Sequence, residues 1–130
     1  MANPNIVNVT SIYGESIGEA LTPTVTTDIM TVASDKLVKI NYISVTNDHA
    51  STAVVVTLAI VKADFTSDGI GSGEDNAATI YLASTITLPA DDVLVVVDKP
   101  IYLMEGDVLE GGANPATADI FISYEVIDDA

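Results

Sequence analysis

The amino-acid sequence predicts an all-β protein, an antiparallel two-sheet sandwich for which a jelly roll is one fitting topology. Three observations support this fold class. From residue 88 to the end, short apolar runs alternate with turns rich in Pro, Gly and Asp, as short antiparallel strands require. The apolar residues are mainly Val, Ile, Ala and Leu, and aromatics make up only 5%. No segment longer than a turn or two has the periodicity of an amphipathic helix.

The central part of the chain predicts two consecutive strands. Residues 37–46 alternate in character, with Val38, Ile40, Tyr42 and Ser44 on one face. Residues 47–51 have the Asn and Asp that favour a turn, and residues 53–61 are almost continuously apolar, as in a central strand covered on both sides. We therefore expect these two strands to form a hairpin. Further strands are expected at residues 24–32, 79–83, 86–88, 93–97, 101–104, 108–110 and 120–127.

The first 23 residues differ in composition from the rest and predict an extended N-terminal arm. Short apolar pieces are mixed there with Asn, Ser, Gly and Pro. Residues 6–9 could add a short strand, and the stretch up to Leu21 is expected to be extended. Such an arm either reaches a partner subunit or is a loosely attached terminus. Residues 24–130 are then one sandwich domain, large enough to bury its own core.

The charge of the chain excludes two classes of partner. Nineteen Asp and Glu stand against four Lys and no Arg, for a net charge of −15. Such a protein repels phosphate, so neither nucleic acid nor an anionic membrane is an expected partner. The charge keeps a strand-rich chain soluble, or forms an outward face that holds neighbours apart. No apolar run approaches the roughly 18 residues of a membrane span, and the N-terminus lacks the pattern of a signal peptide.

One loop has the spacing of a calcium ligand set. Counted from Asp64, oxygen-bearing residues fall at positions 1, 3, 5, 9 and 12, and Gly69 is at position 6. Thr66 replaces the usual acid, and Asp75 replaces the bidentate Glu. The flanks also predict strands where such loops normally have helices. A solvated acidic loop is the competing interpretation, and no metal ligand or cofactor is assigned.

The remaining polar residues do not predict catalysis. His49 is the only imidazole and lies in a turn, and the chain has no Cys for covalent chemistry. The adjacent acids at 91–92 and 128–129 lack the aromatic-lined cleft of a glycosidase. We therefore expect a protein that is not an enzyme, with no catalytic residue.

The five tyrosines are candidates for an interface. Tyr42, Tyr102 and Tyr124 fit the edges of strand cores with a bonded hydroxyl, whereas Tyr13, in the predicted arm, is the better interface residue. Asn8 begins a glycosylation sequence that no secretion signal accompanies.

Several segments, in order along the chain, resemble one family. They are residues 1–12 (MANPNIVNVTSI), 39–47 (KINYISVTN), 81–90 (YLASTITLPA), 101–109 (IYLMEGDVL) and 122–127 (ISYEVI). Together they resemble small virion structural proteins of tailed marine bacteriophages, especially the cyanophage-type myoviruses. The sequence departs from this pattern at the acids 91–92 and at the loop 64–76.

The resemblance implies a capsid decoration or cement protein. Such a protein binds the major capsid protein on the outside of the shell, and a homotrimer is the implied assembly. A neck, tail or fibre-attachment component of the virion is the alternative. A calcium-dependent carbohydrate-binding or adhesin module is a more distant one.

Overall fold

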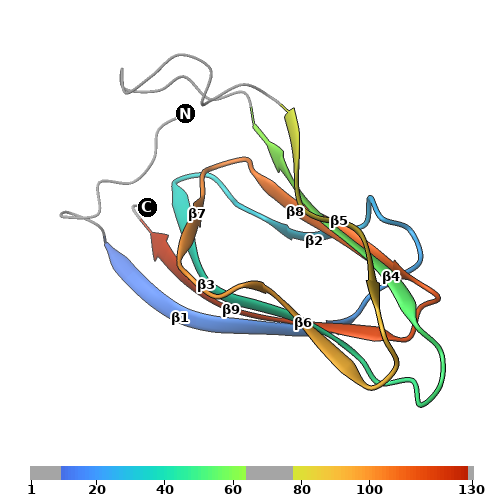
Figure 1. The fold of residues 1–130 in the computed structure, drawn as a ribbon. Helices are drawn as coiled ribbons and strands as arrows, with labels where there is room; N and C mark the ends of the chain where they lie inside the picture. The colour runs from blue at the N-terminus through green and yellow to red at the C-terminus, as the bar shows by residue number, and fades with distance from the viewer. Residues whose placement is uncertain (1–9, 64–77, 129–130) are drawn as a thin grey trace.

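The computed structural model describes residues 10–63 and 78–128, and every regular element in these two parts is a β-strand (Figure 1). The fold is therefore all-β, as predicted. The strands are β1 (Ser11–Ala20), β2 (Asp28–Thr31), β3 (Lys36–Asn47), β4 (Val54–Lys62), β5 (Ala78–Leu88), β6 (Asp92–Val97), β7 (Ile101–Leu103), β8 (Val108–Asn114) and β9 (Ala118–Asp128).

The strands form two antiparallel sheets that pack face to face. One sheet has the order β1-β9-β3-β6, with β7 also paired to β3, and the other has the order β2-β8-β4-β5. The pairings are nested: β4 pairs with β5, β3 with β6 and β7, β2 with β8, and β1 with β9. The chain thus behaves as one long hairpin that is rolled up, and the pairs β3–β9 and β4–β8 close the two sheets. This nested arrangement is a jelly roll.

The predicted hairpin between residues 37–46 and 53–61 is wrong, although both strands exist. β3 and β4 lie in different sheets, so the turn between them passes from one layer to the other. Each strand instead pairs with strands far away in the sequence, β3 with β9 and β4 with β8. Alternation predicts that a strand exists, but it does not identify the partner strand.

The predicted arm is also wrong where the structure describes it. Residues Ser11–Ala20 form the edge strand β1, which pairs with β9 over ten consecutive residues. Leu21 follows in the core with 3% of its surface exposed. The sequence did not predict this strand because β1, as a largely exposed edge strand, is rich in small and polar residues that are typical of loops. The possible strand at residues 6–9 lies outside the described residues.

The core fills the space between the two sheets. The fully buried side chains include Ile40, Ile43 and Ile122 from the first sheet, and Leu58 and Leu109 from the second. Outward residues alternate with core residues over much of the strands, as a sandwich requires. A bulge after Ile40 interrupts this in β3, so Tyr42 and Ser44 lie on the opposite face from Ile40, and the predicted common face is wrong. The predicted strands 79–83 and 86–88 are one strand, β5, with a bulge near Thr85, whose φ is 48°.

Strand β8 is longer than predicted because two glycines continue it. A Cβ on Gly111 would lie 2.5 Å from the carbonyl oxygen of Thr57, and one on Gly112 would lie 2.5 Å from that of Thr22. Only glycine allows the backbone of β8 to lie this close to Thr57 of β4 and to Thr22, in the connection between β1 and β2. The sequence indicated a turn at this place, because glycine pairs more often mark turns than central strands.

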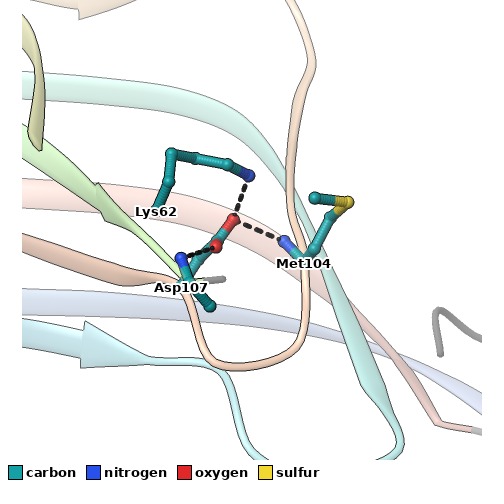
Figure 2. Close-up of polar contacts among 4 residues, drawn as sticks. Lys62, Met104 and Asp107 are labelled. Atoms are coloured by element: carbon teal, nitrogen blue, oxygen red, sulfur yellow. Dashed lines mark hydrogen bonds and ion pairs between the residues drawn. The ribbon is translucent and has the colours of Figure 1, made fainter. Parts of the chain in front are cut away.

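Asp107, whose polar contacts are drawn in Figure 2, holds one end of the sandwich together, and its side chain is fully buried. Its Oδ2 accepts hydrogen bonds from Lys62 Nζ at 2.6 Å and from the Met104 backbone N–H at 2.9 Å, and its Oδ1 accepts one from the Ala63 backbone N–H at 2.9 Å. Its backbone carbonyl accepts from Val32 N–H at 3.0 Å. One residue therefore joins the ends of β2 and β4 to the turn between β7 and β8.

The opposite end is organised by Asn47, which is also fully buried. Its Nδ2 donates to the carbonyl of Thr52 at 2.8 Å and to that of Pro89 at 3.1 Å, and its Oδ1 accepts from Thr117 Oγ1 at 3.2 Å. The residue therefore links the β3–β4, β5–β6 and β8–β9 connections. In the described parts of the chain, every buried side-chain nitrogen and oxygen has a partner.

We predict that Asp107→Ala lowers the free energy of unfolding by about 3–5 kcal/mol, because it leaves a partly buried ammonium and two backbone N–H groups without their acceptor. Lys62→Met should cost less, because the carboxylate keeps its two backbone donors. Urea denaturation measures both. Asp98→Ala is the control, because Asp98 is exposed in a turn. Equal stability of the two Asp variants would contradict the role of Asp107.

We also predict that Asn47→Ala lowers the free energy of unfolding by about 3 kcal/mol, because it leaves several backbone carbonyls without a donor. Thermal unfolding followed by circular dichroism measures the loss. The neighbouring exposed Asp48 provides the matched control as Asp48→Ala. If the two variants have the same melting temperature, Asn47 does not hold the three connections together.

Candidate interaction surface

The outward side of the β1-β9-β3-β6 sheet is the most distinctive surface of the molecule. Ile43, Val45, Ile120 and Ile122 point into the core, so the residues between them on β3 and β9 point outward. The register then places two rows side by side on that outward side. We call these residues the outer patch: Gly18, Phe121, Ser44 and Val95 in one row, and Ala20, Asp119, Thr46 and Val93 in the next.

The outer patch exposes large apolar side chains among small ones. Phe121 is 46% exposed, Val93 50% and Val95 45%. Nothing lies within 4 Å of the position that a Cβ on Gly18 would take, so the surface beside Phe121 is open. A shallow hollow of about 490 Å³ lies at this place, lined by β1, β9 and Thr46. Contiguous exposed apolar surface of this kind is typical of an interface.

The outer patch is also poor in charge, although the chain has a net charge of −15. Asp119 is its one ionisable residue. The next outward row, Ser16, Ser123 and Tyr42, is uncharged, and the row after it carries the ion pair between Lys39 Nζ and Glu125 Oε2, 3.7 Å apart, whose two charges offset each other. The carboxylates that dominate the composition therefore leave this face nearly neutral.

A second hollow, of about 290 Å³, lies where β1 and β2 leave the sandwich open. Tyr13, Met30 and Lys36 are among its lining residues. Tyr124 Oη donates a hydrogen bond to Glu15 Oε2 at 2.8 Å here. Burial, followed by this hydrogen bond and the negative charge of Glu15, raises the pKa of Tyr124 to about 12.

The tyrosines only partly follow their predicted roles. Tyr124 packs against the core and its hydroxyl is bonded, as predicted. Tyr102 was predicted to lie at the edge of the core, but it points outward from β7 and is 49% exposed. Tyr13 is 48% exposed at the β1 edge and lines the second hollow. Tyr81 on β5 is the most exposed tyrosine, at 59%, and the sequence did not single it out.

The other polar candidates have structural roles in turns and ends. His49 Nδ1 accepts hydrogen bonds from the backbone N–H groups of Ser51 and Thr52, so the ring closes its own turn. Asp91 adopts a φ of 55°, and Asp92 accepts a bond from the Val93 N–H. Asp128 Oδ2 lies 2.6 Å from Lys36 Nζ, and this hydrogen bond raises the pKa of Lys36.

Within residues 10–63 and 78–128, no group of three or more His, Cys, Asp or Glu side chains is placed to hold a metal ion. The calcium-like loop from Asp64 to Asp75 lies outside these residues, so its prediction stays untested. In the same two parts of the chain, no helix has the length and apolar character to cross a membrane.

The fold and surface define an all-β jelly-roll protein with one charge-poor outer sheet face. No model of a known protein family matches the sequence, and no curated protein matches it significantly. Among solved structures, a chain in the acidic stable capsid structure of Helicobacter pylori bacteriophage KHP30 is 9% identical, with a TM-score of 0.46 over 94% of this chain and 91% of that one.

A chain in the structure of infectious bursal disease virus, Gx strain, is 11% identical, with a TM-score of 0.32 over 91% of this chain and 38% of that one. Both neighbours therefore come from virus particles. At these values neither likeness carries an argument about the function of this chain.

We predict that Tyr124 stays protonated as pH rises above 10 and ionises near 12. The raised pKa in the folded protein means that Tyr124 adds stability below about pH 10, which is lost as pH rises toward 12. The phenolate absorbance of the wild type minus that of Tyr124→Phe isolates this titration. Glu15→Gln should lower the midpoint while burial keeps it raised. Glu19→Gln, on the same strand, should leave it unchanged, and an equal shift in both variants would contradict the role of Glu15.

Proposed function

We propose that this chain is a structural protein of a virus particle, and that it acts as a decoration or cement protein on the outside of the capsid shell. The observation that carries the proposal is the outer patch, a broad and nearly neutral face in a chain of net charge −15. A protein that works by contact area needs such a face. It needs no catalytic group, and we propose a binding role and not an enzymatic one.

Three further features support this function. The sequence segments that resemble marine phage virion proteins occur in order along the chain, from its first residues to residue 127. The jelly roll is an architecture found in viral capsid domains, although lectins share it. A strongly acidic protein is also repelled by the phosphates of nucleic acid, so it would not bind the packaged genome.

The proposal includes the partners that the resemblance implies. The major capsid protein is the proposed binding partner, and a homotrimer is the proposed assembly. Contact across adjacent capsid subunits would then stabilise the shell, because the protein binds the assembled state and not the separate subunits.

The proposal is tested on particles of the virus whose genome encodes the chain. We expect mass spectrometry to find the protein in purified heads that lack tails, and antibodies against it to label intact particles on their surface. Particles made without it should release their genome at a lower temperature. Its absence from heads would rule out the decoration role, and its presence only in tails or necks would support the alternative virion location.

A further inference from the structure

The outer patch contains one charged group, the side chain of Asp119, which has no partner among residues 10–63 and 78–128. Asp119 is exposed and lines the hollow beside Phe121. The ion pairs in the described residues join Lys36 to Asp128, Lys39 to Glu125 and Lys62 to Asp107, so none includes Asp119. Glu19 also lines this hollow. A carboxylate that a partner covers has an unfavourable free energy unless that partner supplies a cation.

A second copy of the chain is poorly equipped to supply this cation. The sequence has no Arg and only four Lys, and three of these lysines form the ion pairs just described. A two-fold contact between two outer patches would also place the carboxylates of two Asp119 residues in the same interface, which is unfavourable. Lys99, in the turn after β6, is the one remaining lysine for a contact between copies.

We infer that the outer patch binds a different protein, which places a Lys or Arg side chain against Asp119 and an apolar side chain in the hollow beside Phe121. The inference rests on the proposed function and specifies the chemistry of the partner surface. The charge complementarity favours a different protein, because three of the four lysines of this strongly acidic chain are already paired within it. Phe121 supplies the aromatic anchor that interfaces of this kind concentrate near their centre.

The test uses shells that lack the protein, to which the full-length purified chain is added back. Asp119→Lys should weaken binding to these shells roughly 30-fold or more, because it sets like charges against each other. Phe121→Ser should weaken it by a similar factor of roughly 30 through loss of the anchor. Both residues are exposed, so the variants should melt at the wild-type temperature.

Matched controls lie on the other sheet. Asp28→Lys makes the same change in net charge at an exposed position of β2, and Tyr81→Ser removes an exposed aromatic residue from β5. Both should bind like the wild type. Lys99→Ala should also bind like the wild type, because the partner supplies the cation.

The outcomes separate the inference from the proposed function. If the wild-type chain does not bind the shells, the decoration role is wrong and the inference falls with it. If the wild type binds but Asp119→Lys and Phe121→Ser bind equally well, the decoration role stands and the inference is wrong. If Lys99→Ala loses binding as Asp119→Lys does, and the wild type self-associates in sedimentation, the patch binds a second copy and the inference is wrong.

Discussion

The hydrogen bonds to the buried carboxylate of Asp107 hold together the end of the sandwich where β4 meets the β7–β8 turn. The two carboxylate oxygens accept three hydrogen bonds, and one donor is the ammonium of Lys62. Burying an ion pair contributes little net stability, but either charge alone would be costly. The pair therefore requires β4 and the β7–β8 turn to meet in one arrangement. Because those two segments belong to opposite arms of the nested hairpin, this constraint helps to specify the jelly roll over other sandwiches.

Each of the two sheets has edge strands whose free backbone groups could pair with a strand of another molecule. The edge strand β1 carries Glu15 and Glu19 on the side that faces the other sheet, and such inward-pointing charges discourage a further strand from pairing. The edge strand β5 has no charged residue, but it is irregular, with two shifts in its register against β4. Bulges bend a strand away from a regular edge. These two edges, β1 and β5, are thus poorly suited to pairing with another strand.

The sequence predicted the strands better than their partners. Alternation correctly assigned Ile120, Ile122 and Tyr124 to one face of the last strand, and Phe121 to the other. It could not show that Phe121 lies beside Gly18 and Val95, because those neighbours come from β1 and β6, far away in the chain. The outer patch is a product of register, and register depends on long-range pairing. The buried roles of Asn47 and Asp107 were not predicted, because polar residues at strand ends are usually exposed. Their hydrogen-bond partners also come from distant parts of the chain.

The nested pairing also decides where the two ends of the domain emerge. Ser11 pairs with Asp128, so both ends of the described chain lie at the Asp107 end of the sandwich. Gly18 and Ala20 are further along β1, and at about 3.4 Å per residue the outer patch begins roughly 25 Å away. A polypeptide that leaves the described chain at Ser11 or Asp128 would therefore have to extend roughly 25 Å along the sheet before it covered the patch. The same separation makes the Asp107 end of the sandwich the place to insert a foreign peptide for display, because that end lies away from the outer patch.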